Sequence, residues 1–414
     1  MSSRTAAPVR PVRTDTGEPD LAALRAAVRD WCAANVPAGW QERQTGASHE
    51  EFVRFQREWL GTLRAGGLAV PHWPADYGGG FSLAEQAVIF EELARAEAPR
   101  LVLHFVSLHH AAATLLDAGT AEQRERHLPA ILDGEVWCQG FSEPEAGSDL
   151  ASLRTRAERR GDVYVVNGQK VWASLAMYAD WCLLLARTDP DAPKRRGISY
   201  FLMDMRSPGL TVRPIRQAGG EEHFCEIFLT DVEIPAANLI GPENDGWRVA
   251  QRTLNTERGA TMVELAERLA VGFGRLVDLA RRTTGPDGSP MADDSAVRDH
   301  LARLATQVRA LRLLVARAVA EAESDVPAAG ALASVIKLYY SELLQRVTGY
   351  GVEIAGPAGQ RAARRPMSAG WESGAWLLDF IGSWEWTIPG GTSEIQRSII
   401  GERALGLPRE PGLA

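Results

Sequence analysis

The hydrophobic period of this chain changes twice, and the change limits the folds that it can adopt. In the first third of the sequence, apolar residues recur at three- and four-residue spacing, the period of a helix that buries one face. The middle part alternates with a period of two, which is typical of strands, and the helical period then returns. Because 414 residues exceed one ordinary hydrophobic core, we expect an α+β multidomain protein. Its predicted parts are a disordered lead-in (1–20), an N-terminal all-α domain (21–135), a middle β-barrel domain (136–245) and a C-terminal four-helix-bundle domain (246–414).

Capping signals and apolar stripes support the two helical parts. The segments 82–85 and 120–123 have the capping-box form, and a loop rich in proline and glycine occupies 71–80. His109 and His110 fall on an expected helix, where adjacent residues do not share a face, so no metal pair is expected there. Further predicted helices cover 262–276, 294–323 and 329–354.

Short β-branched or aromatic runs mark the middle part. They are broken by Gly, Pro and Asp and cover 163–166, 181–186, 198–203, 210–214 and 225–234. Asn167 and Gly168 follow the first run and precede Val171 and Trp172, which is the pattern of a two-residue hairpin. Several such strands in close succession indicate a small barrel or sandwich.

Charge and cysteine usage exclude several classes of function. The net charge of -8 argues against nucleic acid and anionic membranes as partners. The four cysteines have no C-x-x-C spacing, so neither a zinc site nor a disulfide framework is expected, and a reducing cytoplasm fits best. The first twenty residues lack the apolar run of a secretory signal, and no apolar stretch reaches membrane-spanning length.

Three short segments carry the functional signal. In 139–149, Ser142 and Ser148 lie six residues apart with a proline and a glycine between them, so the segment presents hydroxyls and backbone N–H groups outside any regular helix. The second segment, 167–174, places a tryptophan and a serine after β-rich residues. The third, 390–397, reads Gly-Gly-Thr-Ser-Glu-Ile-Gln-Arg and precedes a predicted helix over 398–407.

These three segments, in this order and spacing, resemble the flavin-contacting and closing segments of the acyl-CoA dehydrogenase family, and the resemblance covers about 21–408. It implies a three-domain flavoenzyme that binds FAD and an acyl-CoA and passes electrons to an electron-transferring flavoprotein. It also implies a homotetramer or a heterotetramer with a related chain. The cofactor contacts that it implies are Gln139, Phe141, Ser142, Gly147, Ser148, Trp172, Ser174, Arg281, Glu353, Gly356, Thr392 and Glu394.

Two places depart from the family's pattern. Pro357 lies in 353–359, where the family has a Gly-Gly pair that meets a neighbouring subunit's flavin, and proline has no N–H to donate. Arg281 is present, but the aromatic residue that often follows it in the family is missing. The resemblance therefore supports cofactor binding within the subunit more strongly than across subunits.

The family's chemistry requires a base for the α-proton, an acceptor for the β-hydride and donors for the carbonyl oxygen. Many members place the base two residues before the threonine of the third segment, where this chain has Gly390, which offers only its backbone N–H. Other members carry the glutamate on a C-terminal-domain helix just before an arginine, and the resemblance then implies that Glu257 is the base. The substrate contacts that it implies are Ser148, Asn255, Arg258 and Gly391.

Three alternatives stay open on the same fold. The chain could be a non-catalytic or co-catalytic subunit of a heterotetrameric acyl-CoA dehydrogenase, an acyl-CoA oxidase that reacts with oxygen directly, or a biosynthetic dehydrogenase acting on a carrier-protein thioester. The length and shape of the acyl group depend on cavity volume and are not predicted. A base on the helix is compatible with long, branched or polycyclic acyl groups.

Overall fold

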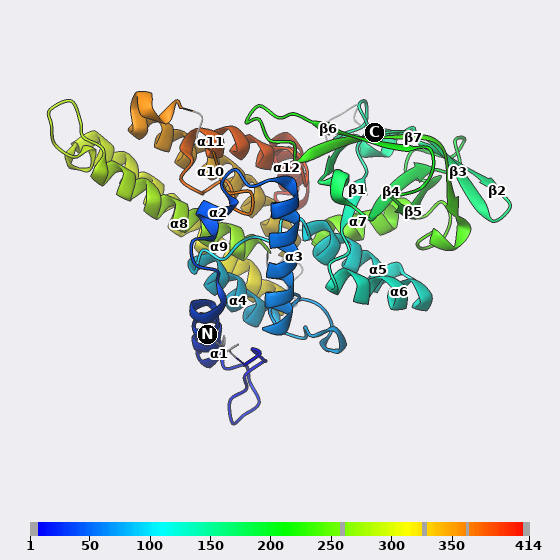
Figure 1. Cartoon of the computed structure of the whole chain (residues 1–414), viewed down its shortest axis with the longest axis horizontal. Coiled ribbons are helices and arrows are strands. Elements are labelled where there is room, and N and C mark those ends of the chain that lie inside the picture. Colours follow the sequence, from blue (N-terminus) through cyan, green and yellow to red (C-terminus); the bar gives the residue numbers. More distant parts are fainter. Residues whose placement is uncertain (1–6, 257–260, 325–328, 362–363, 409–414) are drawn as a thin grey trace. The chain divides into compact units, whose positions relative to one another are not determined.

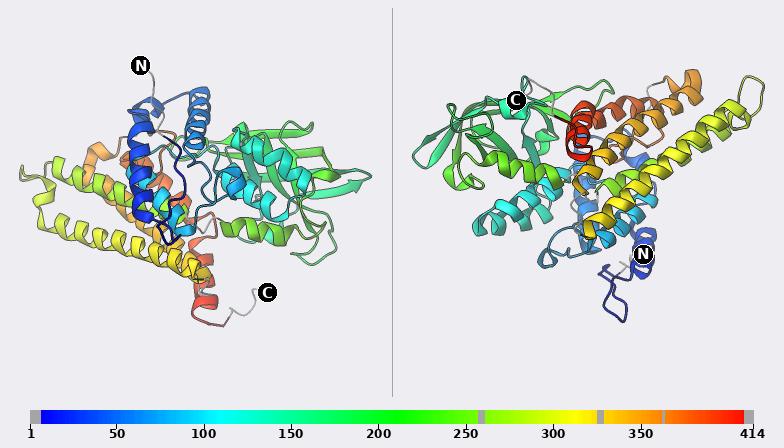
Figure 2. Two further views of the ribbon diagram at one scale, coloured as in Figure 1. Left: turned by 90° about the horizontal axis from the view of Figure 1, so that it is seen from below. Right: turned by 180° about the vertical axis from the view of Figure 1, so that it is seen from behind.

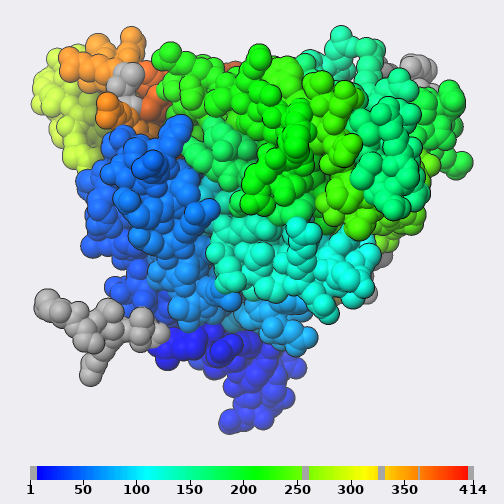
Figure 3. Space-filling view, turned by 45° about the vertical axis from the view of Figure 1, so that its right-hand side comes forward, coloured from blue at the N-terminus to red at the C-terminus, as the bar shows by residue number. Residues whose placement is uncertain are grey.

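The computed structural model describes residues 7–256, 261–324, 329–361 and 364–408 (Figure 1). The chain forms two compact units. We call Met1–Arg100 together with Arg258–Ala414 the helical unit, and Leu101–Glu257 the sheet unit. Figure 3 shows the surface of the sheet unit in cyan to green.

Helices from both ends of the sequence build the helical unit. The N-terminal ones are α1 (Leu21–Asn35), α2 (Trp40–Gln44), α3 (His49–Ala65) and α4 (Leu83–Arg95). The C-terminal ones are α8 (Thr261–Arg282), α9 (Ser295–Glu323), α10 (Ala329–Gly359), α11 (Trp376–Ser383) and α12 (Ser393–Ile399). Figure 2 shows the long helices α8 and α9 side by side.

The apolar stripe predicted for α8 is confirmed. Leu265, Leu269 and Leu276 are buried in one core with residues of α9 and α10. The capping box that begins at Ser82 is confirmed at α4, and Asp294 accepts backbone N–H groups at the start of α9. The expected helix limits are therefore close to the observed ones, because the caps are encoded locally.

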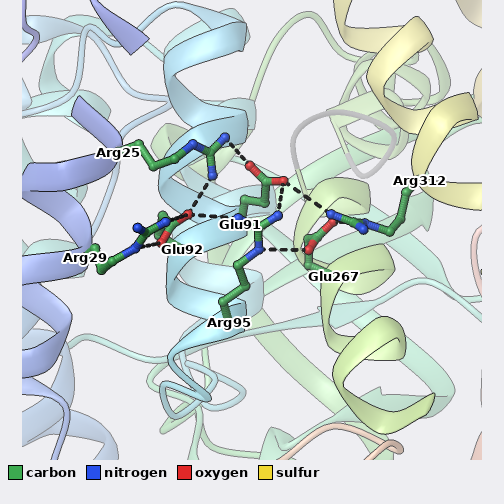
Figure 4. Close-up of polar contacts among 7 residues, drawn as sticks. All are labelled: Arg25, Arg29, Glu91, Glu92, Arg95, Glu267 and Arg312. Carbon is green, nitrogen blue, oxygen red and sulfur yellow. Dashed lines mark hydrogen bonds and ion pairs between the residues drawn. The ribbon is translucent and has the colours of Figure 1, made fainter. Parts of the chain in front are cut away.

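A network of charged side chains joins the N-terminal to the C-terminal helices (Figure 4). Glu92 of α4 is nearly buried and accepts hydrogen bonds from arginines of α1 and of its own helix. Glu91 pairs with Arg25 of α1 and, at 3.7 Å, with Arg312 of α9. Arg312 also pairs with Glu267 of α8. Ion pairs thus connect four helices that are distant in sequence.

The sheet unit contains helices and one seven-stranded sheet. Its helices are a π-helical turn (Val106–Ala111), α5 (Ala112–Ala118), α6 (Ala121–Leu132) and α7 (Gly246–Thr256). The strands are β1 (Trp137–Gly140), β2 (Arg156–Arg160), β3 (Val163–Ser174), β4 (Trp181–Arg187), β5 (Ile198–Asp204), β6 (Leu210–Ile215) and β7 (Phe224–Pro235). The order is β1-β4-β2-β3-β7-β6, with β5 paired to β4.

The predicted fold class is confirmed: helices come first, a β half-barrel follows, and helices return. All five predicted strands exist, and the capping box at Thr120 begins α6. Strands β1 and β2 were not predicted; β1 is only four residues long, and β2 is almost entirely exposed and charged.

Two local predictions are wrong. Asn167 and Gly168 do not form a hairpin, because β3 runs unbroken from Val163 to Ser174 and only its register with β7 shifts there. A glycine is required at 168 by packing, since a Cβ would lie 2.4 Å from the Thr155 hydroxyl oxygen. The closing helix begins earlier than expected, at Ser393, where Thr392 caps it.

All four cysteines are free and buried. Although they are far apart in sequence, Cys138 of β1 lies opposite Cys182 of β4, and Cys225 of β7 belongs to the same core. Within the described ranges, no group of three or more potential metal ligands is found, and no helix is long and apolar enough to cross a membrane.

Candidate functional site

The first motif segment leaves the sheet at the end of β1. Gly140 must be small, because a Cβ there would lie 2.9 Å from the Cys182 sulfur. Beyond it, the backbones of Glu143 and Ala146 exchange two hydrogen bonds of 3.0 Å and close a turn. The carbonyl oxygen of Ser142 accepts the N–H of Val171 at 2.9 Å. The first motif segment is thus bonded directly to the second, which lies on β3.

A buried ion pair ties the same two segments together. Lys170 of β3 is fully buried, and its Nζ donates to the carbonyl oxygen of Phe141 at 3.1 Å and to Glu143 Oε1 at 2.8 Å. The Glu143 carboxylate also accepts the N–H groups of Arg154 and Thr155 at 2.6 and 2.9 Å. Together these bonds fix both ends of the segment 141–155 against β3.

Burial lowers the pKa of the Lys170 ammonium, although Glu143 opposes that shift. For Glu143, burial alone would raise the pKa, but the charge and hydrogen bond of Lys170 and the other donors outweigh it, and the pKa is lowered. Sequence reasoning missed both residues. A signal for the buried lysine was available in the sequence. Side chains alternate between the two faces of a strand, and this alternation puts Lys170 on the same face as Tyr164 and Val166, in a chain that has only three lysines.

The end of β3 is bent so that a tryptophan points away from the core. Trp172 has a φ of 62° and Leu175 a φ of 53°, both in the left-handed region, and the register with β7 shifts between Lys170 and Ala173. For such bulky residues this backbone conformation costs on the order of 1–2 kcal/mol each. The Trp172 side chain is 58% exposed, and its ring meets Phe224 edge-on. The strained backbone at Trp172 therefore leaves its indole ring largely exposed to solvent.

Other predicted residues of the sheet unit offer polar groups or space. The amide nitrogen of Gln139 is buried and has no hydrogen-bond partner among the described residues. Gly147 and Ser148 are exposed, and a Cβ on Gly147 would meet nothing within 4 Å. Ser174 is half-buried at the end of β3. An unpaired donor, an exposed indole and open backbone suit a planar cofactor with a polar edge.

In the helical unit, the third motif segment forms a turn before α12. Gly390 and Gly391 have φ values of 65° and 96°, which favour glycine. Their carbonyl oxygens are both held: Gln396 Nε2 donates to Gly390 and Lys337 Nζ donates to Gly391, each at 2.6 Å. Thr392 caps α12 through its hydroxyl. The turn is therefore rigidly defined, with a half-exposed Gly390.

The remaining predicted contacts of the helical unit lie in separate places. Glu394 is exposed in the first turn of α12, where its own N–H and Thr392 lower its pKa. Arg281 is exposed near the end of α8 and pairs with Asp278 at 3.2 Å. Glu353 is exposed on α10. Gly356 has a φ of 57° and a ψ of -141° and interrupts the helical backbone just before Pro357.

Three predicted residues cannot be placed in this site. Glu257 and Arg258 lie outside the described residues, and Asn255 is in the last turn of α7 with a side chain that is not described. The structure brings Gln139, at the end of β1, and Phe141 and Ser142, just beyond it, close to β3 with Trp172 and Ser174, through the hydrogen bond from Val171 to Ser142. It places Gly390, Gly391, Thr392 and Glu394 in one turn.

Comparisons with known proteins place the chain among acyl-CoA dehydrogenases. Models of the N-terminal, middle and C-terminal domains of acyl-CoA dehydrogenase match residues 18–135, 138–232 and 244–405. The acyl-CoA dehydrogenase IpdE1 of Mycobacterium tuberculosis is 40% identical over 397 residues, which cover 94% of this chain and 99% of that protein.

Two solved structures are similar along almost the whole chain. The "Tcur3481-Tcur3483 steroid ACAD" has a TM-score of 0.80 and 32% identity, and covers 96% of this chain and 100% of its own. The ChsE4-ChsE5 complex from Mycobacterium tuberculosis has a TM-score of 0.77 and 31% identity, and the match covers 97% of this chain and 100% of the chain in that structure.

Proposed function

The chain belongs to the acyl-CoA dehydrogenase family, and from that premise we propose the reaction that it performs and the residues that carry it. As an acyl-CoA dehydrogenase it is an oxidoreductase. The proposed reaction removes hydrogens from the α and β carbons of an acyl-CoA thioester and leaves a trans-2-enoyl-CoA. The observation that carries this proposal is the exposed indole of Trp172, held by a left-handed backbone next to the Ser142–Val171 hydrogen bond.

The residues of the sheet unit fit FAD, the cofactor of the family. The unpaired Gln139 amide, the Phe141 and Ser142 backbone and the Trp172 and Ser174 side chains would hold the flavin ring. Gly147 and Ser148, which are open and exposed, would face the pyrophosphate and the acyl-CoA. In the helical unit, the proposed contacts are Arg281, Glu353, Gly356, Thr392 and Glu394. When bound, FAD supplies the acceptor for the β-hydride.

Proton removal is assigned to Glu257, and the Gly390 N–H is the proposed donor to the thioester carbonyl oxygen as negative charge develops on it. Support for the second role is that Gly390 is half-exposed, has a defined left-handed φ of 65° and has its carbonyl oxygen held by Gln396. Asn255, Arg258 and Gly391 are proposed to contact the substrate.

The test is Glu257→Gln, with Glu125→Gln, an exposed glutamate of α6, as the control. Both variants should bind FAD, because glutamine has nearly the shape of glutamate. Anaerobic flavin bleaching by a good acyl-CoA substrate should slow by about 10²–10⁴ in Glu257→Gln and stay unchanged in the control. Bleaching of Glu257→Gln at the wild-type rate would exclude Glu257 as the base. A chain that stays colourless with added FAD would refute the flavoprotein assignment.

The similar structures support a second proposal about substrate and assembly. One is described as a steroid ACAD and the other as a complex of two chains. We propose that this chain accepts a bulky, polycyclic acyl-CoA, since Gly390 leaves space where many relatives carry a glutamate. We also propose that it forms a homotetramer or a heterotetramer with a related chain. Co-expression with candidate partners, followed by light scattering and FAD quantification, tests the assembly; a stable, FAD-loaded monomer contradicts it.

Electron transfer and location complete the proposal. We propose that the reduced flavin is reoxidised by an electron-transferring flavoprotein in the cytoplasm. We also propose that the three domains meet near residues 135 and 245. An oxygen-uptake assay separates this from an oxidase: turnover that consumes one oxygen per acyl-CoA, without any added acceptor, would identify an oxidase instead.

A further inference from the structure

The buried pair of Lys170 and Glu143 has contacts that point to a specific task. Lys170 is 0% exposed and Glu143 is 9% exposed. Every hydrogen bond described above for the pair ends on the segment 141–155, at the Phe141 carbonyl oxygen or at the N–H groups of Arg154 and Thr155. The pair therefore joins the first motif segment to the strand that carries the second.

Such a pair is a poor device for stability alone. Desolvating an ammonium and a carboxylate is costly, and well-packed apolar residues of similar volume are often as stabilising or more so. An ion pair differs from apolar packing because its hydrogen bonds have direction. In this chain the directed bonds fix the backbone on both sides of Ser142, and Val171, the residue after Lys170, donates to the Ser142 carbonyl oxygen.

We propose that Lys170 is a positioning residue for FAD binding: through Glu143 and the Phe141 carbonyl oxygen, it holds the segment 141–149 in the conformation that binds the cofactor. This inference rests on the proposed function, because it takes FAD to be the ligand of that segment. Without Lys170 the segment samples other conformations, and the apparent dissociation constant for FAD rises in inverse proportion to the fraction of the chain that keeps the competent one.

A second lysine that contacts the same segment provides a matched control. Lys194 Nζ contacts Asp149 Oδ2 at 2.7 Å, but both side chains are mostly exposed, at 66% and 62%. Water competes for an exposed pair, so the bond contributes little to the ordering of the segment. Lys170→Met and Lys194→Met remove the same charge from two lysines that touch the same segment, one buried and one exposed.

The experiment measures FAD binding to the apo form of the full chain by flavin fluorescence, together with urea unfolding, at a temperature well below melting. Lys170→Met should weaken FAD binding by about 10- to 100-fold, the range expected when hydrogen bonds to a charged group that order the site are lost. Lys194→Met should stay within about twofold of wild type, as expected for an exposed ion pair.

The double variant Glu143→Gln/Lys170→Met separates positioning from general stability. Removing the unpaired buried carboxylate should restore much of the resistance to urea that Lys170→Met loses. FAD affinity should remain as low as in Lys170→Met, because the tether to β3 is still missing. If Lys170→Met does not fold, the affinity of the double variant decides the question.

Three results overturn the proposal: wild-type FAD affinity in folded Lys170→Met, equal losses in Lys170→Met and Lys194→Met, or recovery of FAD affinity together with stability in the double variant. Failure of the proposed function is distinct from these, since in that case the wild-type apo chain itself would not bind FAD.

Discussion

Replacing Glu92 with glutamine should destabilise the helical unit, because this carboxylate is the most buried acceptor of the network in Figure 4. It is 3% exposed and accepts hydrogen bonds from Arg25 at 2.5 Å, from Arg29 at 3.0 and 3.2 Å, and from Arg95 at 3.1 Å. Arg25 and Arg29 lie on α1, so the same carboxylate fastens α1 to α4.

The expected magnitude follows from the exposure of the arginines. Removing one partner of a fully buried pair costs about 3–5 kcal/mol, whereas exposed pairs contribute about 0–1 kcal/mol. The side chains of Arg25, Arg29 and Arg95 are 32%, 61% and 38% exposed, so water partly solvates them once Glu92 is neutral. Glutamine also keeps one acceptor oxygen. We therefore expect a loss of about 2–3 kcal/mol in the free energy of unfolding, between these limits.

The pH dependence gives the same prediction a second readout. Burial would raise the pKa of Glu92, but its bonds to Arg29 and Arg25 outweigh burial, and the pKa is lowered. A lowered pKa means that the ionised group stabilises the fold fully above the ordinary pKa of glutamate, and that this contribution disappears as the pH falls through the lowered value. The difference between wild type and Glu92→Gln should be full at pH 7 and shrink in strong acid.

Differential scanning calorimetry measures the effect. A loss of this size corresponds to a melting temperature lower by about 4–10 °C for a unit of this size. The control is Glu58→Gln, an exposed glutamate on α3, which should shift the melting temperature by about 1 °C or less because isolated surface changes cost little. Equal melting temperatures for Glu92→Gln and the control at pH 7 would refute the view that this network fastens α1 to the unit.

Three further outcomes are expected. Gly391→Ala should lose about 1–3 kcal/mol of stability, because the φ of 96° at Gly391 disfavours any residue with a side chain. The control Gly274→Ala, on an open face of α8, should be neutral or gain up to about 1 kcal/mol, and equal melting temperatures for the two variants would contradict this. Burial raises the pKa of Asp379 to about 7 although Arg365 opposes it, so its stabilising contribution is full below about pH 4 and is lost as the pH rises through 7. The wild type should therefore lose stability relative to Asp379→Asn between about pH 4 and about pH 7, and parallel pH profiles would be inconsistent with this. Trp172→Ala should weaken FAD binding but leave the stability of the apo protein within about 0.5 kcal/mol of wild type, since the side chain is 58% exposed. A large fall in the melting temperature of the apo protein would show that the indole serves packing instead.

Features that depend on neighbouring residues were predictable from the sequence. The capping boxes at Ser82 and Thr120 specify their helix starts within four residues, and both are observed. The apolar stripe of α8 and the period-two runs of the middle part were likewise read from local spacing. The turn at Gly390 and Gly391 was not predicted; few residues other than glycine adopt its left-handed backbone.

The error at Asn167 and Gly168 shows where local signals fail. The dipeptide favours a tight turn, but β7 pairs with β3 on both sides of it, from Val163 opposite Pro235 to Ser174 opposite Phe224. The long ladder satisfies more backbone hydrogen bonds than a hairpin at this position could. Tertiary pairing therefore overrides the turn preference.

By itself, the sequence determined the order of helical and strand regions, the capping boxes and the family motifs, since each depends on residues close together along the chain. Only the tertiary structure decided that Lys170 meets Glu143, that Glu92 meets Arg25, and that Trp172 takes a strained, outward conformation. The physical reason is distance along the chain. Partners that are separated by tens of residues meet only after the sheet register and helix packing are set, and no local pattern encodes those.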